Sequence, residues 1–479
     1  YLRKNKAKLL DIKVINGSVV MCRIMYKEKR IEFRDSYAIL PASLERLTND
    51  FNVEHKKLKM DYELGVNDKN FVQYFNNDLM GLYEVLEQSQ SLLEKLTLAG
   101  NTMNIFIKKF YKEKISNNSL KLNELFRQGY YGGRVEIFKL RGVELNYYDI
   151  NSLYPSVMHD FEYPLIENHN YEYTNEYIPD TLGYYYCNIK TPDMNIPILP
   201  YRREDKKLIF PVGSWSGWYY SPEIAKAREL GYKIDVKRGY VFKKTDYIFK
   251  DFVEYYYNIK RHSSGSKKAI AKLLLNSLYG KFGQRTEFDE FIIGNGSERY
   301  FYIPFLNLTR TKRVSYAKYQ HSEIAGLITS YARVRLYELF ERAGIENIYY
   351  CDTDSIITSS LLKTSDALGD IKNESAISEF IAIAPKVYAY TSKDNGEVVI
   401  KAKGLNAKQL SFEDFRNAIY RNDFSKFVYE YERIATFKQY SVRHLNNFSD
   451  KLKVIRHLKS SYDKRIINVK DLSTMPFKV

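Results

Sequence analysis

The sequence predicts a mixed α/β (α+β) protein that is divided into two or more domains. With 479 residues, the chain is too long for one compact hydrophobic core. Short apolar and aromatic runs that end in aspartate, as in residues 145–149 and 349–357, indicate buried strands. Longer segments, such as residues 71–96, repeat their apolar residues at helical spacing.

The first half of the chain is expected to alternate strands, a helix and loops. The predicted elements are strands at Val14–Val20 and Ile31–Phe33, a helix at Phe71–Leu96 and a strand at Leu145–Asp149. GYYGG at residues 129–133 is a glycine-rich loop and a predicted joint between domains. Residues 160–245 are expected to be rich in loops because prolines recur there.

The second half is expected to be more helical. The predicted elements are helices at Tyr247–Arg261 and Lys267–Phe282, joined by a turn at HSSGS (262–266), and a helix at Ser322–Ala343. Residues 284–320 are predicted to form a small β insertion. The last 80 or so residues are rich in Lys and Arg and are predicted to be mostly helical.

Composition narrows the class of protein and its partners. No run approaches the ~18 apolar residues of a membrane span, so we expect no integral membrane protein. The first residues do not form a signal peptide, and three scattered cysteines favour a reducing, intracellular compartment. The formal net charge of +16 makes nucleic acid the first partner class to consider.

Acidic residues interrupt two of the predicted core strands. In YYCDTDSII (349–357), Asp352 and Asp354 are expected at the tip of a hairpin. A polar turn would also explain them, because aspartate is a common turn residue. Asp149 ends another aromatic strand and adds a third carboxylate. Three such groups could hold two Mg²⁺ or Mn²⁺ ions ~4 Å apart and act on phosphates.

A basic face is predicted on the helix at 267–282. Lys268, Lys272, Asn276 and Tyr279 recur at intervals that place them within ~80° of one another. Lys260, near the end of the preceding helix, could point at the same space. A solvated lysine face is the alternative. Together with the acids, these groups favour nucleotidyl transfer, which needs positioning and charge neutralisation.

Three motifs, in order, resemble those of family B DNA polymerases: DINSLYPS (149–156), KLLLNSLYG (272–280) and YCDTDS (350–355). The resemblance implies a right-hand polymerase with palm, fingers and thumb, preceded by part of a ribonuclease-H-like 3′–5′ exonuclease domain. It also implies Mg²⁺ as cofactor, two ions for which Mn²⁺ can substitute, with DNA and dNTPs as partners.

Finer features resemble the protein-primed subgroup of phages, linear plasmids and viruses. YYGG (130–133) is similar to its linker motif, and Lys386-Val387-Tyr388 to its Lys-x-Tyr motif. Residues 160–245 and 284–320 stand where that subgroup carries two insertions, which contact the terminal protein and enclose DNA. Residues 210–234 look most like polymerases of mitochondrial linear plasmids, which implies a mitochondrial location; otherwise the host cytoplasm is expected.

The resemblance divides the chain into seven expected segments. They are 1–125 (C-terminal part of the exonuclease domain), 126–159 (linker loop and first palm segment), 160–245 (first insertion), 246–283 (fingers), 284–320 (second insertion), 321–400 (second palm segment) and 401–479 (thumb). We expect a monomer, or a heterodimer with the terminal protein.

Site residues follow from the matched motifs. Asp149 and Asp354 would be the main metal ligands, with Asp352 assisting and the Ile150 carbonyl joining them. Tyr154 would stack under the incoming sugar. The remaining implied roles are triphosphate binding by Lys260, Lys268 and Lys272, base-pair contacts by Asn276 and Tyr279, and DNA contacts by Tyr130, Gly132, Gly133, Ser152, Gly280, Lys386 and Tyr388.

The exonuclease motifs match only in part. Tyr74 and Asp78, on one predicted helical face, resemble the third exonuclease motif, while the first two are absent. Asp61 and Glu63 lie too close to Asp78 to be the first. We therefore expect the chain to begin inside the exonuclease domain and expect no proofreading by it alone.

Three other functions compete with protein-primed synthesis. A nucleic-acid-primed family B polymerase would share the same acids and lysines. A decayed polymerase would bind DNA without incorporating nucleotides. A reverse transcriptase also carries an aspartate pair at a hairpin tip, but SLYPS (152–156) and the Asn-Ser-Leu-Tyr-Gly helix point away from it.

Overall fold

The computed structural model describes residues 7–15, 18–59, 68–285, 287–294, 301–303, 307–314, 319–435, 439, 451–458 and 462–479. The chain forms two compact units, and each combines segments that are distant in sequence. Unit 1 comprises residues 1–112, 249–318 and 433–452. Unit 2 comprises residues 113–248, 319–432 and 453–479. The seven segment boundaries given above stay predictions.

Unit 1 combines two small antiparallel sheets with helices. Its strands are β1 (Lys8–Ile15), β2 (Ser18–Tyr26) and β3 (Lys29–Arg34) in one sheet, and β14 (Glu287–Ile293), β16 (Leu308–Val314) and β15 (Phe301–Ile303), in that order, in the other. Its helices are α1 (Leu44–Asp50), α2 (Lys69–Gln88), α3 (Leu98–Lys109), α7 (Lys250–His262) and α8 (Gly265–Phe282), with short 3₁₀ turns at Ser36–Ala38 and Gln90–Leu92. Strand β1 packs on β14.

An aromatic cluster joins three of these helices. Phe106 of α3 has its ring centroid 5.8 Å from that of Phe252 on α7 and 6.2 Å from that of Phe282 on α8, both edge-on. Phe249 closes the cluster against Phe106 at 5.2 Å. Edge-on aromatic pairs add to the stability gained by burial. The buried side of α8 is therefore fixed, and its opposite side stays exposed.

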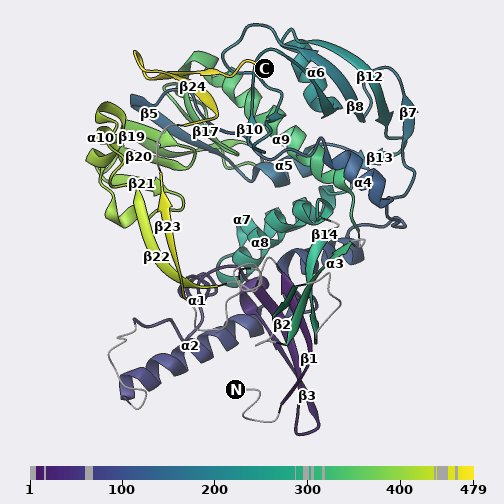
Figure 1. The fold of residues 1–479 in the computed structure, drawn as a ribbon, viewed down its shortest axis with the longest axis vertical. Helices are drawn as coiled ribbons and strands as arrows, with labels where there is room; N and C mark the ends of the chain where they lie inside the picture. Colours follow the sequence, from purple (N-terminus) through teal and green to yellow (C-terminus); the bar gives the residue numbers. More distant parts are fainter. Residues whose placement is uncertain are drawn as a thin grey trace. The chain divides into compact units, whose positions relative to one another are not determined.

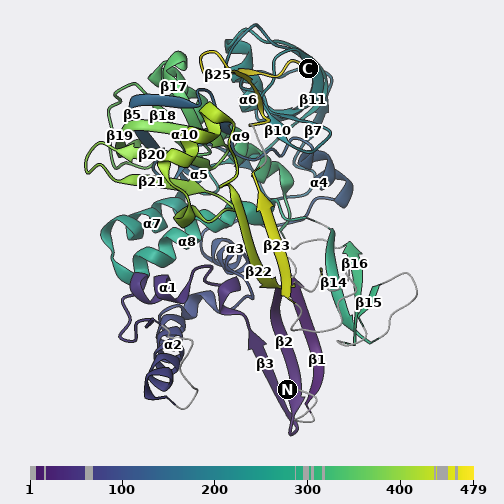
Figure 2. The same ribbon diagram turned by 60° about the vertical axis from the view of Figure 1, so that its left-hand side comes forward.

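The core of unit 2 is a seven-stranded sheet in the order β21-β20-β19-β5-β18-β17-β4 (Figure 1). The strands are β4 (Val135–Ile137), β5 (Arg141–Ile150), β17 (Ile348–Asp352), β18 (Ser355–Thr358), β19 (Ile371–Ala384), β20 (Val387–Ser392) and β21 (Val398–Ala402). Neighbouring strands are antiparallel. Helix α10 (Phe412–Arg421) packs on β19 and β20 (Figures 1 and 2). Its Phe415 side chain is fully buried.

A second sheet of unit 2 has the order β11-β8-β12-β7. Its strands are β7 (Glu172–Thr174), β8 (Gly183–Lys190), β11 (Ser214–Tyr220) and β12 (Lys233–Val241). Helix α9 (Ser322–Ala343) is buried on nearly all sides, packed by α4 (Leu120–Arg127), α5 (Leu153–Asp160) and α6 (Ser221–Glu229). The short strand pairs are β6 (Tyr163–Pro164) with β13 (Thr245–Asp246), β9 (Tyr201–Arg202) with β10 (Leu208–Ile209), and β24 (Arg465–Asn468) with β25 (Ser473–Pro476). Two 3₁₀ turns lie at Ile345–Asn347 and Ala407–Gln409.

The structure confirms several predicted elements. Helix α9 has the predicted bounds, and the predicted strands at Ile31–Phe33 and Leu145–Asp149 lie inside β3 and β5. The β insertion is confirmed in its described residues. The helices predicted at Tyr247–Arg261 and Lys267–Phe282 are α7 and α8, but the turn between them is shorter than HSSGS because α8 already starts at Gly265.

Residues 160–245 contain the long connecting segments that their prolines predict, such as 191–200, but they also form the second sheet and α6, which were not predicted. Three predictions are wrong. Beyond β21, the described residues include the helix α10 and the strands β22 (Val428–Ile434), β23 (Lys451–His457), β24 and β25, so the described C-terminal residues contain more strand than helix. The strand predicted at Val14–Val20 is the junction of two antiparallel strands, β1 and β2. The helix predicted to reach Leu96 ends at Gln88.

No helix among the described residues is long and apolar enough to cross a membrane.

Candidate active site

The register of the seven-stranded sheet places two of the predicted acids in one row. Asp352 of β17 stands opposite Ser355 of β18, which stands opposite Asp149 of β5, which stands opposite Lys372 of β19. Directly opposed residues of antiparallel strands project from the same face. The aspartates predicted to act together therefore share one face of the sheet, with Ser355 between them.

Asp354 reaches the same place from the hairpin turn. The turn residue Thr353 has a φ of 63°, and its N–H donates to the Arg134 carbonyl at 2.7 Å. The carbonyl of Asp354 accepts from the Ile150 N–H at 2.7 Å. Ile150 directly follows Asp149, so this bond ties the turn to the end of β5. The predicted hairpin tip is confirmed.

Gly133 of the glycine-rich loop packs on this turn. A Cβ on Gly133 would lie 2.8 Å from Cγ2 and 2.9 Å from Oγ1 of Thr353, whereas a Cβ on Gly132 would meet nothing within 4 Å. Only glycine at position 133 therefore lets the loop lie this close to the residue between the two aspartates.

The three carboxylates have different electrostatic surroundings. Both oxygens of Asp352 accept hydrogen bonds from Lys386 Nζ, at 2.5 and 2.7 Å. Asp149 Oδ1 lies 3.9 Å from Lys372 Nζ, and Lys372 also pairs with Glu374. None of the described lysines or arginines forms an ion pair with Asp354. Burial, followed by the charge of Asp352, raises the pKa of Asp354.

This donor set suits a hard divalent cation. Three carboxylates and the backbone carbonyls beside them offer only oxygen, which Mg²⁺ and Mn²⁺ prefer. A buried carboxylate beside a like charge would be stabilised by a cation. Their oxygens do not all lie within 4.8 Å of one another; among the described residues, Glu54, His55 and Glu84 of unit 1 form the one group of that kind. Binding one ion with all three carboxylates would therefore require their side chains to move closer together.

Helix α5 begins immediately beyond Asp149. Ser152 precedes it with a φ of 57°, and Tyr154 lies in its first turn, partly exposed. The other end of α5 is fixed by Arg335, which donates to Ser156 Oγ at 2.8 Å and to Asp160 at 2.7 Å. The SLYPS segment is thus a rigid helix start at the acidic row.

A buried ion pair, which the sequence did not predict, holds the glycine-rich loop. Arg333 of α9 makes two hydrogen bonds to Glu223 of α6, at 2.8 and 2.9 Å. Arg333 also donates to the carbonyls of Tyr131 at 2.7 Å and Gly132 at 3.0 Å. Tyr131 is buried, which raises its pKa to about 12, while Tyr130 stays partly exposed. The loop conformation therefore depends on two residues that are 110 positions apart.

Another buried charge cluster stands behind the hairpin. Arg134 donates to Glu136 at 2.7 Å and to the Pro197 carbonyl at 2.7 Å. Arg465 of β24 approaches Glu136 at 3.9 Å and donates to the Asn195 carbonyl at 2.7 Å. The Arg134 carbonyl accepts the hydrogen bond from the Thr353 N–H, so this cluster fixes the backbone that supports the turn.

The predicted Lys-x-Tyr motif lies beside the acids. Lys386 occupies the turn between β19 and β20, and Tyr388 packs on Tyr350, with ring centroids 5.0 Å apart. Burial raises the pKa of Tyr388. The motif therefore supplies an ammonium group to Asp352 and a ring to the core below it. Its predicted contact with DNA stays a prediction.

The predicted basic face lies on α8, in unit 1. Lys268, Lys272 and Asn276 are exposed and Tyr279 is partly exposed, while Ala271, Leu274, Leu275, Leu278 and Phe282 are buried. No described carboxylate pairs with Lys268 or Lys272. Lys260 of α7 lies over the Tyr257 ring at 5.3 Å, and Gly280 is exposed. The shared exposure of this face is confirmed, and its substrate stays a prediction.

The predicted exonuclease residues also meet in unit 1. Lys57 Nζ donates to Tyr74 Oη at 2.8 Å and to Asp78 at 2.7 Å, so both side chains lie on one face of α2. The sequence did not predict Lys57. Asp61 and Glu63 lie outside the described residues.

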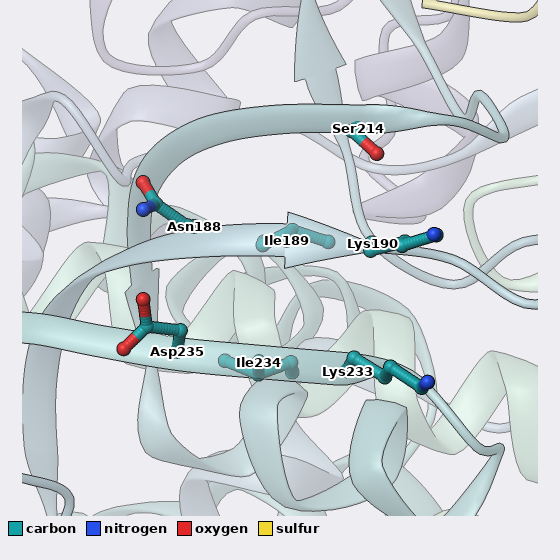
Figure 3. Close-up of a pocket in the computed structure, with 7 residues that line it drawn as sticks. All are labelled: Asn188, Ile189, Lys190, Ser214, Lys233, Ile234 and Asp235. Atoms are coloured by element: carbon teal, nitrogen blue, oxygen red, sulfur yellow. The ribbon is translucent and has the colours of Figure 1, made fainter.

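A separate shallow pocket of about 390 Å³ lies on the second sheet of unit 2. Figure 3 shows Lys190 and Lys233 on neighbouring strands, with Asn188 and Asp235 at the other end of the pocket. Asp235 is paired with Lys237 at 2.5 Å. The pocket shares no residue with the acidic row.

Comparison with known proteins identifies the family. A family model described as DNA polymerase type B, organellar and viral, matches residues 2–78 and 65–303. A "Probable DNA polymerase" of Podospora anserina is 29% identical over 81% of this chain and 41% of the relative. The "DNA-directed DNA polymerase" of Enterobacteria phage PRD1 is 30% identical over 82% of this chain and 72% of the relative. The chain spans less than half the length of the Podospora anserina relative.

The fold comparison agrees. A structure of Phi29 DNA polymerase complexed with primer-template DNA and incoming nucleotide substrates has a TM-score of 0.72 at 22% identity, covering 92% of this chain and 82% of that chain. This likeness shows the fold and confirms the predicted fold class. The family model ends before the third motif at residues 350–355. On the matched residues and the PRD1 relative, the chain belongs to the organellar and viral type B DNA polymerases.

Proposed function

We propose that the chain is a template-directed DNA polymerase that adds dNMPs to a 3′-hydroxyl. One observation carries this proposal above the others. In a chain of this family, the sheet register brings Asp149 and Asp352 to one face of the sheet, and a hairpin turn ties Asp354 to the end of β5 beside them. A polar surface turn alone would not need the buried support that Arg134 and Gly133 provide.

Asp149 and Asp354 would hold the metal ions, with the Ile150 carbonyl and Asp352 completing the site. When bound, Mg²⁺ would activate the attacking hydroxyl and neutralise charge on the reacting phosphates. The residues fit, because the donors are all oxygen and because burial and the charge of Asp352 raise the pKa of Asp354, a penalty that a bound cation would offset. Tyr154, at the rigid start of α5, would support the incoming sugar.

The substrate would be a dNTP and the partner a primer-template duplex. Lys268 and Lys272 are exposed ammonium groups without described carboxylate partners, which suits a triphosphate, and Lys260 would assist them. Asn276 and Tyr279 would line the nascent base pair. DNA contacts would come from the glycine-rich loop together with Ser152, Gly280, Lys386 and Tyr388.

The first experiment is primer extension with Mg²⁺ and dNTPs. Asp354→Asn and Asp352→Ala are expected to lower incorporation by at least about 100-fold, the size of effect seen when a charge-stabilising group is removed from an active site. Asp394→Asn, in an exposed turn of unit 2, is the matched control and should leave the rate unchanged. Undiminished synthesis by both active-site variants would contradict the metal assignment.

We further propose that synthesis starts on a hydroxyl of a terminal protein. The support is the family and the insertion at residues 160–245, which folds as a sheet of its own. The proposed role is replication of a linear plasmid, phage or viral genome, in mitochondria if it is a plasmid. Transfer of dNMP to a purified terminal protein tests priming. Its failure, with primer extension intact, would favour a nucleic-acid-primed polymerase, and tight DNA binding without any incorporation would indicate a decayed one.

A further inference from the structure

We propose that Lys386 gates the metal site: without DNA it occupies Asp352, and a bound nucleic-acid strand draws it away and frees Asp352 for the cation. The inference rests on the proposed function and adds a coupling between DNA binding and metal binding. It assigns Lys386 as a positioning residue that acts through Asp352.

The contact between Lys386 and Asp352 leaves little room for another cation. One ammonium group donates to both carboxylate oxygens, at 2.5 and 2.7 Å. The backbone of Lys386 is fixed as well, because its N–H donates to Tyr350 Oη at 3.1 Å and the residue has a φ of 63°. The ammonium group is therefore positioned by the β19–β20 turn rather than placed at random on the surface.

A close contact in which one ammonium group bonds both carboxylate oxygens is described for Asp352 and not for Asp149 or Asp354. Lys372 lies 3.9 Å from Asp149 and pairs more closely with Glu374, and no described cation pairs with Asp354. Asp352 is separated from Asp149 by one strand, and the three carboxylates do not close to within 4.8 Å. Asp352 is thus the acid of the three whose two oxygens both accept from a described lysine.

Two cations compete for the same carboxylate. A divalent ion near Asp352 would repel the ammonium group a few ångströms away, so metal binding there must break the ion pair. The Lys386 side chain is 36% exposed, and a phosphate of a nucleic-acid strand can reach it. A phosphate that binds Lys386 removes the competitor. DNA and metal should then bind with positive coupling, and the coupling must be reciprocal.

The gate can be tested by titrating the full chain with Mn²⁺ and measuring free Mn²⁺ by electron paramagnetic resonance. This measurement does not require nucleotide incorporation. The titration is run alone and with a primer-template duplex that ends in a dideoxynucleotide, without dNTP, and the duplex alone is subtracted. For the wild type, the duplex should tighten Mn²⁺ binding on the order of tenfold, a common size for coupling between sites. Without DNA, Lys386→Met should bind Mn²⁺ as tightly as the wild type does with the duplex, and adding the duplex should tighten its binding less than about twofold.

Two further variants separate the gate from general electrostatics. Lys386→Arg keeps a cation that can bond both oxygens and should retain the wild-type coupling. Lys372→Met removes a neighbouring charge that does not pair with Asp352, so the duplex should still tighten Mn²⁺ binding in this variant. Asp354→Asn identifies the Mn²⁺ that belongs to this site rather than to Glu54, His55 and Glu84.

The outcomes are distinguishable. If Mn²⁺ affinity depends on Asp354 but Lys386→Met neither tightens it nor reduces the effect of the duplex, the gate is wrong and the proposed function stands. If Mn²⁺ affinity does not depend on Asp354, the metal assignment falls, and the gate falls with it.

Discussion

Replacing Arg333 is expected to destabilise unit 2 and to release the glycine-rich loop. The guanidinium group makes four hydrogen bonds, two to Glu223 and one each to the carbonyls of Tyr131 and Gly132. Arg333→Met would leave the Glu223 carboxylate and both carbonyls without this donor. The loop would then lose the contact that sets its distance from the turn at Thr353.

The size of the effect follows from burial. The side chain of Arg333 is 2% exposed and that of Glu223 is fully buried. Removing one partner of such a pair costs about 3–5 kcal/mol, because the other charge stays buried and unpaired. Replacing both, as Arg333→Met with Glu223→Leu, removes that orphaned charge. The double variant should therefore be destabilised by at least about 2 kcal/mol less than the sum of the two single variants.

Urea unfolding followed by tryptophan fluorescence measures this directly, because both tryptophans, Trp215 and Trp218, lie in unit 2. The matched control is the exposed pair of Lys393 and Glu144, whose side chains are 57% and 63% exposed. Lys393→Met should cost no more than about 1 kcal/mol. The reasoning is refuted if Arg333→Met costs no more than this control, or if the two single effects simply add.

Three other predictions concern the turn and the basic helix. Gly133→Ala should destabilise unit 2 by about 1–3 kcal/mol, since its Cβ would overlap Thr353, while Gly132→Ala should not; urea unfolding compares them. Burial raises the pKa of Asp354 in the folded protein. The folded state therefore loses stability as the pH rises through that raised pKa. Asp354→Asn should therefore melt at a higher temperature than the wild type at pH 7 in EDTA, and the two should converge near pH 3; equal melting at pH 7 would contradict this. Lys272→Met should raise the KM for dNTP on the order of tenfold, the effect of about 1.4 kcal/mol, with DNA affinity unchanged; an unchanged KM would argue against a triphosphate contact.

Local patterns predicted the acidic hairpin and the long buried helix. The run before Asp352 and the apolar residues after Asp354 determine a strand, a turn and a strand without reference to the rest of the chain. Helix α9 has its predicted bounds, and a glycine with a φ of 80°, Gly344, follows its last residue. The exposed face of α8 likewise followed from helical spacing alone.

Non-local pairing caused the failures. Strand β8 pairs with β11 and β12, and nothing within β8 shows which partner it has. The prolines in residues 160–245 indicate loops but do not show which segments between them pair as strands. Exposed lysines and arginines are compatible with either helix or strand, so they do not distinguish the C-terminal strands from helices. Asn16-Gly17, inside the strand predicted at Val14–Val20, is a strong hairpin signal and is consistent with two strands there.

Supporting residues were missed for the same reason. Arg333 and Glu223 are 110 positions apart, and Lys57 is 21 positions from Asp78. Each lies in an ordinary helical or loop context, so only the folded chain shows that it contacts a motif. The sequence signal for Arg333 was its position within a mostly apolar helix, where a buried arginine needs a partner.

The proposed function requires Asp149 and Asp354 to hold the metal ions for nucleotide addition. Single-turnover incorporation of one dNMP onto a bound primer-template tests it most directly, because substrate release cannot mask the chemical step. We predict that Asp149→Asn and Asp354→Asn each lower the rate by at least about 100-fold while binding DNA with wild-type affinity. A rate close to that of the wild type in either variant would contradict the account.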